Sequence, residues 1–155
     1  MRKLIDCMKK KVVTISPDAT IHDAADLMIQ THVGTLVVVD EEKHVLGLLQ
    51  MRDLISLAIP DFIDLFKKMD FIHDFGMLEE NSPDAATLRK SVREMMSPAV
   101  SVESDTGLLH AAALLKEHEL SDMPVMDANG RLIGLASFTD IGSALLSNWE
   151  VHKGH

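Results

Sequence analysis

An internal duplication constrains this chain more than any other feature of its sequence. When the sequence is shifted by 87 residues, residues 5–8 align with 92–95 and residues 54–56 with 141–143, without a gap. Identical pairs at this offset include Met8 and Met95, Val13 and Val100, Val38 and Val125, Gly47 and Gly134, and Asp53 and Asp140. Two copies of one supersecondary unit usually bury their apolar faces against each other. We therefore expect any ligand to bind at the seam between the copies.

Length and composition indicate one compact paired domain. With 155 residues, 46% of them hydrophobic, the chain can close a core but cannot build two large domains. No segment approaches the ~18 consecutive apolar residues of a membrane span, and Asp6 interrupts the start before a secretory signal could form. The net charge of -9 argues against a broad nucleic-acid surface. Because the single cysteine, Cys7, cannot form an internal disulfide, we expect a cytoplasmic protein.

Apolar periodicity predicts the order strand, helix, strand, strand, helix in each copy. In the first copy we expect strands at 12–15, 36–39 and 45–49, a helix capped by Thr20, and a helix at 53–58. In the second copy we expect strands at 100–102, 124–126 and 132–136, a helix over 107–118, and a last helix from Thr139. The fold class is therefore predicted to be α/β, with two tandem β-α-β-β-α repeats.

The predicted boundaries leave a segment between the repeats. We assign 1–57 to repeat 1, 58–90 to a helical insertion, 91–147 to repeat 2 and 148–155 to a tail. Four of the five phenylalanines, Phe62, Phe66, Phe71 and Phe75, fall in the insertion, partly at helical spacing. Two interpretations stay open for this segment: it closes the core of its own module, or it forms a dimer interface or docking face.

Three sequence stretches of the second copy resemble one known family in their order and spacing. They are Met-Met-Ser-Pro-Ala-Val-Ser-Val at 95–102, Asp-Met-Pro-Val-Met-Asp at 122–127 and Gly-Leu-Ala-Ser-Phe-Thr-Asp-Ile at 134–141. With the duplication, the chain resembles a tandem pair of cystathionine-beta-synthase (CBS) domains, a Bateman module. The resemblance implies two repeats about a pseudo-two-fold axis, with adenosine-type ligands in the clefts between them. It also implies association into disc-like homodimers that signal by ligand-dependent tilting.

The resemblance implies a preferred site in the second copy. There Ser137 and Asp140 place a hydroxyl and a carboxylate at the start of the last helix, after Gly134. In such a site the carboxylate accepts both ribose hydroxyls, and each charge-assisted hydrogen bond contributes about 1.5 to 3 kcal/mol. The nucleotide-binding residues expected for this site are Val100, Ser101, Met123, Pro124, Ser137, Thr139 and Asp140.

A second site is implied in the first copy, with one departure from the family pattern. Its expected residues are Val13, Thr14, Leu36, Val37, Gln50, Arg52 and Asp53. Gln50 stands where the hydroxyl belongs, whereas Arg52 is suited to bidentate phosphate contacts. Lys9, Lys10 and Lys11 precede the first strand, and basic residues in such modules can serve the opposite repeat's site.

These residues also have structural interpretations. Asp53 and Asp140 would be good helix N-caps without any ligand, and Arg52 and the lysines could be solvated charges. The eight histidines lack the paired spacing with Cys or carboxylates that zinc sites use, so we expect no metal. No nucleophile elbow, Walker loop or dinucleotide fingerprint is present, so we do not expect an enzyme.

The sequence thus predicts a regulatory ligand-sensing module. By resemblance, its ligand is an adenosine compound such as AMP, ADP, ATP, S-adenosylmethionine or NADH, acting as an effector and not as a catalytic cofactor. Its output passes to an unknown effector protein through a conformational change. Two alternatives remain: a ligand-free scaffold or dimerisation module, which Gln50 favours, and an enzyme that uses the nucleotide as cofactor.

Overall fold

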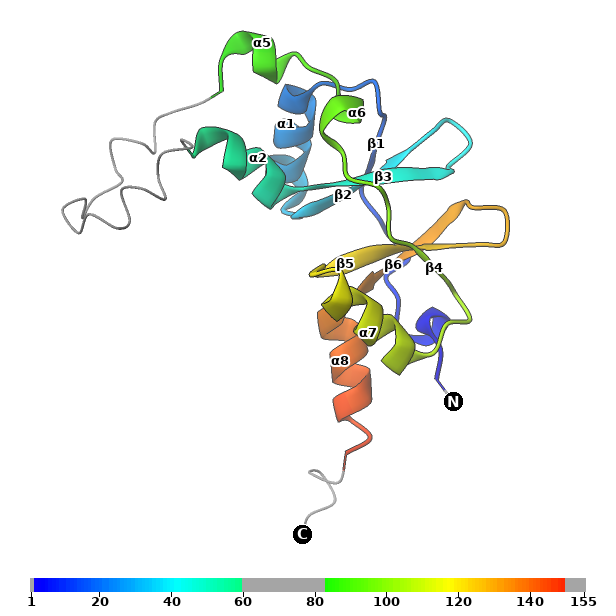
Figure 1. Cartoon of the computed structure of the whole chain (residues 1–155). Coiled ribbons are helices and arrows are strands. Elements are labelled where there is room, and N and C mark those ends of the chain that lie inside the picture. The colour runs from blue at the N-terminus through cyan, green and yellow to red at the C-terminus, as the bar shows by residue number, and fades with distance from the viewer. Residues whose placement is uncertain (1, 60–82, 150–155) are drawn as a thin grey trace, which may run out of the picture.

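The computed structural model describes residues 2–59 and 83–149, which form two similar units (Figure 1). The first unit contains β1 (Thr14–Ile15), α1 (Ile21–Thr31), β2 (Thr35–Val39), β3 (Val45–Gln50) and α2 (Met51–Ala58). The second contains β4 (Val102–Glu103), α7 (Leu108–Glu117), β5 (Asp122–Met126), β6 (Leu132–Ser137) and α8 (Phe138–Leu146). The predicted α/β repeat is therefore confirmed. The hypotheses on the Phe62 to Phe75 segment and on most of the 148–155 tail lie outside the described residues.

Each unit has its own three-stranded mixed sheet. The strand orders are β1-β2-β3 and β4-β5-β6, and in both sheets the first pair is parallel and the second antiparallel. The registers are equivalent too, since Val38 pairs with Gly47 and Val125 with Gly134, and an irregularity follows each pair. The duplication in sequence is thus a duplication of hydrogen-bonding pattern.

The closing helix of each unit begins earlier than the sequence predicted. Thr20 caps α1 as expected, with its side chain accepting from the Asp23 N–H. The N-caps of α2 and α8, however, are Gln50 and Ser137. Asp53 and Asp140 occupy the third position of each helix, so their interpretation as N-caps is wrong.

The segment that leads into each copy packs on the other copy. Leu4, in the 3₁₀ helix η1 (Leu4–Asp6), is fully buried in the core of the second unit. Its amide donates to the Thr106 carbonyl at 3.0 Å. Val92, in α6 (Val92–Met95), is likewise fully buried in the core of the first unit, and a short helix α5 (Ala85–Leu88) precedes it. The two leading segments therefore cross between the units, as Figure 1 shows.

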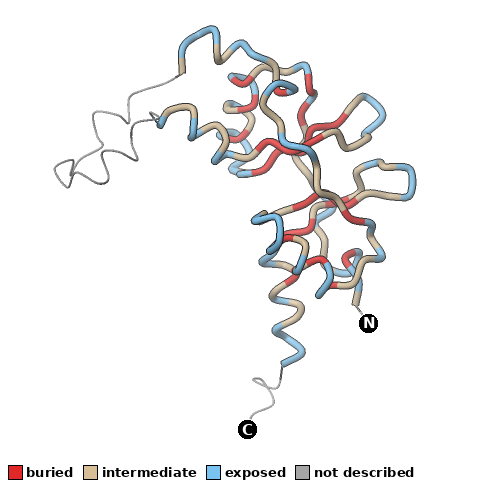
Figure 2. Tube along the Cα trace, in the orientation of Figure 1, coloured by how far each residue is buried: buried red, intermediate tan, exposed pale blue. Residues whose placement is uncertain are grey.

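A third apolar cluster joins the units at the seam. Val37, Val39 and Leu48 of the first sheet are buried there, with Leu132 and Leu135 of the second sheet packed against them. The hairpin tips also pair: Val45 N–H donates to the Gly130 carbonyl at 3.1 Å, and Leu132 N–H to the Lys43 carbonyl at 2.9 Å. Buried residues concentrate along the strands and the helix faces turned toward them (Figure 2). Packing and backbone pairing together hold the two units in one arrangement.

None of the helices within residues 2–59 and 83–149 is long and apolar enough to span a membrane.

Candidate functional site

A cleft surrounds Asp140 at the start of α8, and we call it the Asp140 cleft. Its volume is about 620 Å³. It is lined by Lys9, Leu115, Lys116, Glu119, Leu120, Ser121, Asp122, Ser137, Phe138, Thr139 and Asp140. Ser137 Oγ accepts from the Asp140 N–H at 3.0 Å, which fixes the hydroxyl beside the carboxylate. Three of the residues predicted for this site, Ser137, Thr139 and Asp140, therefore line one cleft.

Lys9 enters the Asp140 cleft from the first copy of the sequence. The backbone of Lys9 pairs with that of Leu135, with N–O distances of 2.9 and 2.8 Å. This crossing carries the Lys9 Nζ to 3.9 Å from Asp140 Oδ2, where both side chains remain partly exposed. A basic residue from the first copy thus stands beside a carboxylate of the second copy. Lys116, from α7, lines the same cleft and adds a second positive charge.

Gly47 and Gly134, which are equivalent positions of the two copies, make room for the crossing segments. A Cβ atom on Gly134 would lie 2.9 Å from the Lys9 carbonyl oxygen, and one on Gly47 would lie 2.7 Å from the Ser97 carbonyl oxygen. A glycine can also leave room for a ligand to approach the backbone. The structure instead gives the space to backbone, because Leu48 and Ser97 pair in the same way as Leu135 and Lys9.

A smaller cleft of about 200 Å³ surrounds Asp53, and we call it the Asp53 cleft. It is lined by Leu48, Gln50, Arg52, Asp53, Ser97, Pro98, Val100, His118 and Leu120. Asp53 Oδ2 accepts from the Gln50 N–H at 3.0 Å, so this carboxylate already closes a capping box. At α8 the hydroxyl of Ser137 caps the helix instead, and Asp140 Oδ2 faces Lys9. The Asp53 carboxylate therefore has a backbone hydrogen bond at this oxygen, whereas the Asp140 carboxylate has a lysine nearby.

The structure regroups several predicted site residues. Val100 lines the Asp53 cleft, not the Asp140 cleft to which the sequence reasoning assigned it. The reason is the crossing, since the segment that contains Val100 runs over the first sheet before it enters the second. Thr14 lies in a third place, a cavity at the outer end of the first sheet.

Other predicted base contacts are core residues. Leu36, Val37 and Met123 have no exposed surface, and each belongs to one of the three apolar clusters. Val13 is half-buried against the core of the first unit. Pro124 is buried in β5, and Ser101 is half-buried just before β4. These positions support the sheets that carry the clefts, and none of them lines either cleft.

A small cavity of about 220 Å³ lies between the two clefts, and we call it the middle cavity. Gly34, Thr35, Gln50, Arg52, Ser121 and Asp122 line it. Gln50 and Arg52 also line the Asp53 cleft, and Ser121 and Asp122 also line the Asp140 cleft. Thr35 Oγ1 donates to Asp122 Oδ2 at 3.0 Å. The three spaces are therefore adjacent parts of one seam.

Sequence reasoning missed Lys116, His118 and Asp122 as cleft residues and Thr35 as a residue of the middle cavity. The offset of 87 residues makes Thr35 and Asp122 equivalent positions, and that signal could have placed them opposite each other at the pseudo-two-fold axis.

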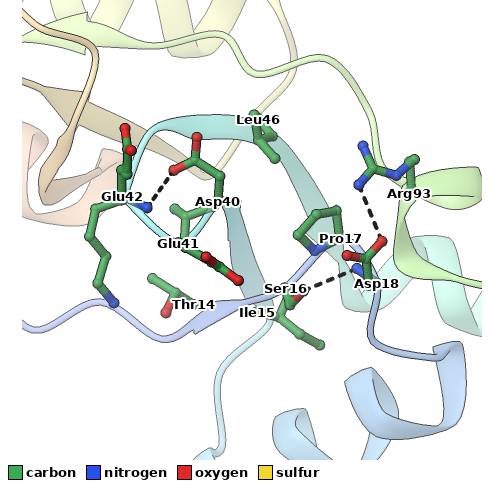
Figure 3. A pocket seen from close by; sticks show the side chains of 12 residues that line it. Thr14, Ile15, Ser16, Pro17, Asp18, Asp40, Glu41, Glu42, Leu46 and Arg93 are labelled. Atoms are coloured by element: carbon green, nitrogen blue, oxygen red, sulfur yellow. Dashed lines mark hydrogen bonds and ion pairs between the residues drawn. The ribbon is translucent and has the colours of Figure 1, made fainter.

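The largest of these cavities, about 730 Å³, lies at the outer end of the first sheet (Figure 3). Three of its charged groups, Asp18, Arg93 and Asp40, already have partners. Arg93 lies 3.2 Å from Asp18, and Asp40 Oδ1 accepts from the backbone N–H groups of Glu42 and His44 at 2.9 and 2.8 Å. The carboxylates of Asp18 and Asp40 in Figure 3 therefore serve the ion pair and the turn.

Cys7 lies half-buried near the Asp140 cleft. Burial raises the pKa of its thiol, and the negative charges of Asp140 and Asp6 raise it further. A thiol with a raised pKa is a poor nucleophile at neutral pH. No group of three or more His, Cys, Asp or Glu side chains within residues 2–59 and 83–149 is arranged to hold a metal ion.

The family of the chain follows from a match to a family model. The model of the CBS domain matches residues 4–59 and 90–147. The chain belongs to the CBS domain family, and it carries two CBS domains in tandem.

Several known proteins match the chain over most of its length. The chain is 28% identical over 142 residues to an uncharacterized 17.7 kDa protein of Acidianus ambivalens, covering 92% of this chain and 70% of that protein. It is 29% identical over 149 residues to the CBS domain-containing protein YhcV of Bacillus subtilis, covering 96% and 89%. Against the chloroplastic CBS domain-containing protein CBSX2 of Arabidopsis thaliana, it spans 60% of the relative's length.

Solved structures of CBSX2 share the fold. A crystal structure of CBSX2 in complex with AMP has a TM-score of 0.72 and 27% identity, covering 95% of this chain and 98% of that one. A second CBSX2 structure, from Arabidopsis thaliana, has a TM-score of 0.69 and 26% identity, covering 94% of each chain.

Proposed function

We propose that this chain is a regulatory module that binds adenosine-containing ligands at the seam between its CBS domains and signals by changing shape. The observation that carries the proposal is the pairing of Ser137 and Asp140 at the start of α8, inside a cleft of about 620 Å³. The complex of the related CBSX2 with AMP supports the ligand class. We propose AMP, ADP or ATP as effectors, with S-adenosylmethionine and NADH as further candidates.

The Asp140 cleft is the preferred site of this proposal. Asp53 already accepts a capping hydrogen bond from Gln50, whereas Asp140 faces the partly exposed charge of the Lys9 side chain. A ribose diol can replace a weak ion pair at 3.9 Å more readily than it can replace a backbone hydrogen bond at 3.0 Å. Lys9 and Lys116 would then be positioned near the phosphates of a nucleotide.

A thermal-shift panel tests the ligand class. AMP, ADP, ATP, S-adenosylmethionine and NADH are each added to the wild type, to Asp140→Ala and to Asp105→Ala, an exposed aspartate outside the clefts. A ligand at a hundred times its Kd adds about 2.7 kcal/mol, which raises the Tm of a chain of this size by roughly 5 to 10 °C. We expect a rise that Asp140→Ala abolishes and Asp105→Ala keeps. No rise with any ligand would favour the ligand-free scaffold.

We also propose that the module forms a homodimer through α2 and α8. Exposed apolar side chains stand at equivalent positions of these helices: Met51 with Phe138, and Ile59, just after α2, with Leu146. All four are between 41% and 49% exposed. Because the two stripes repeat one pattern, a second copy turned by a two-fold axis would match α2 against α8. Such an interface is self-complementary.

Sedimentation analysis tests the dimer. Phe138→Glu with Met51→Glu should convert a dimer to a monomer, because it places charges in the apolar stripe. Ile29→Glu, on the exposed face of α1, is the matched control and should leave the dimer intact. A wild-type monomer would contradict the proposal.

We propose that the module is not an enzyme. We also propose that it passes its signal to a separate effector protein. The cytoplasmic location stays a proposal as well, since the relative CBSX2 is chloroplastic.

A further inference from the structure

The middle cavity brings together two opposite charges from different repeats. Arg52 reaches it from the start of α2, and Asp122 reaches it from the start of β5. Gly34, Thr35, Gln50 and Ser121 complete the wall. Its volume of about 220 Å³ is too small for a second nucleoside with phosphates, but it suits a compact polar group.

The carboxylate of Asp122 is held in place. Thr35, which is only 7% exposed, donates its hydroxyl proton to Asp122 Oδ2 at 3.0 Å. One side of the carboxylate is thereby fixed, and the other oxygen still has acceptor capacity. A phosphate in this cavity would meet the Arg52 guanidinium but would also face the negative charge of Asp122. A phosphate tail is therefore a poor electrostatic match for the middle cavity.

A zwitterion matches the two charges. An α-amino acid group presents a carboxylate, which Arg52 can bind through two parallel N–H donors, and an ammonium, which Asp122 can accept. The cavity adjoins the Asp140 cleft through Ser121 and Asp122, so such a group could be attached to the adenosine that the cleft holds. We infer that the middle cavity is an α-amino acid subsite, with Arg52 and Asp122 as its specificity-determining residues. This inference rests on the proposed function.

The test compares ligands that differ only in the amino acid group. S-adenosylhomocysteine carries an adenosine and a zwitterion without a sulfonium charge, and 5'-methylthioadenosine carries the adenosine alone. Calorimetric titration of the full chain should give S-adenosylhomocysteine at least about a tenfold smaller Kd. Free methionine as a third ligand distinguishes an attached from a free amino acid. Binding of methionine by the wild type but not by Asp122→Asn would assign the subsite to the free form.

Variants assign the effect to the two charges. Arg52→Ala and Asp122→Asn should each weaken S-adenosylhomocysteine by about tenfold and leave 5'-methylthioadenosine unchanged. Asp122→Asn keeps an oxygen that can accept from Thr35, so we expect the variant to fold. Arg93→Ala and Asp105→Asn, both outside the seam cavities, are the matched controls.

Failure of the inference is distinguishable from failure of the proposed function. Equal affinities for the two thioethers, both lost in Asp140→Ala, would overturn the amino acid subsite and leave the adenosine site standing. A gain in AMP or ATP affinity in Asp122→Asn with a loss in Arg52→Ala would assign the middle cavity to phosphate and overturn the inference. Absence of binding by any adenosine compound would overturn both.

Discussion

Thr35 Oγ1 donates a hydrogen bond to Asp122 Oδ2 at 3.0 Å, and these two residues occupy equivalent positions 87 residues apart in the two copies. They start β2 and β5, the central strands of the two sheets. The pair therefore ties the repeats together at the point where the pseudo-two-fold axis passes between them, beside both candidate clefts.

Loss of the Thr35 hydroxyl should destabilise the fold. Thr35→Val leaves Asp122 without its donor in a half-buried position, and we expect a loss of about 1 to 3 kcal/mol in the free energy of unfolding. Urea denaturation measures it. Thr31→Val, on an exposed turn of α1, is the control and should change stability by less. Equal effects at the two positions would show that the Thr35 bond contributes nothing specific.

Alanine substitutions should have opposite effects on stability at the glycines of the two crossings and at a glycine of α8. Gly47→Ala and Gly134→Ala place a Cβ within 3 Å of the Ser97 and Lys9 carbonyl oxygens, and we expect each to cost about 1 to 3 kcal/mol. Gly142, in α8, has no atom within 4 Å of such a Cβ. Gly142→Ala should therefore stabilise the chain by about 0.5 to 1 kcal/mol. Thermal unfolding of the three variants checks the signs, and a neutral Gly134→Ala would contradict the crossing.

The first residues of the chain should stabilise the second unit. Leu4→Ala removes a fully buried side chain from the core formed by α7, β5 and α8, at a cost of about 2 to 5 kcal/mol. Ile5→Ala, at a position that is 52% exposed, should cost far less. Amide hydrogen exchange locates the effect: faster exchange in β5 and β6 is expected. Loosening confined to the first sheet would show that residues 4–6 pack elsewhere.

Cys7 should react slowly with alkylating reagents. Its thiol pKa is raised by burial first and then by Asp140 and Asp6, so the thiolate fraction at pH 8 is smaller than that of a free cysteine. Iodoacetamide kinetics monitored by mass spectrometry give the rate at this single cysteine. Asp140→Asn should accelerate the reaction, and Asp6→Asn should do so by a smaller factor. An unchanged rate in Asp140→Asn would show that the charge of Asp140 does not raise the pKa of the Cys7 thiol.

The sequence predicted the repeated elements well because their signals are local. Thr20 caps α1 as expected, and the apolar run Leu36 to Val39 forms a buried strand. The helix starts at Met51 and Phe138 were missed because Gln50 and Ser137 end a strand and cap a helix at once. Periodicity identifies where a strand ends, but the cap depends on which side chain meets the first free N–H groups.

The candidate site was only partly predictable. Ser137, Thr139 and Asp140 lie on adjacent positions of one helix start, so their proximity follows from the sequence alone. Lys9 and Val100 reach clefts of the opposite repeat because their segments cross, and hydrophobic pattern does not say which sheet a segment covers. Met123 was predicted to contact the base, but its side chain is fully buried in the core of the second unit.

Isothermal titration of AMP into Asp140→Ala and Asp53→Ala tests the proposed ligand site most directly. Both aspartates are at the third position of equivalent helices, so the two variants make the same change in each repeat. We expect Asp140→Ala to raise the Kd by about tenfold or more and Asp53→Ala to raise it by a smaller factor. Equal losses, or a larger loss in Asp53→Ala, would contradict the assignment of the preferred site to the Asp140 cleft.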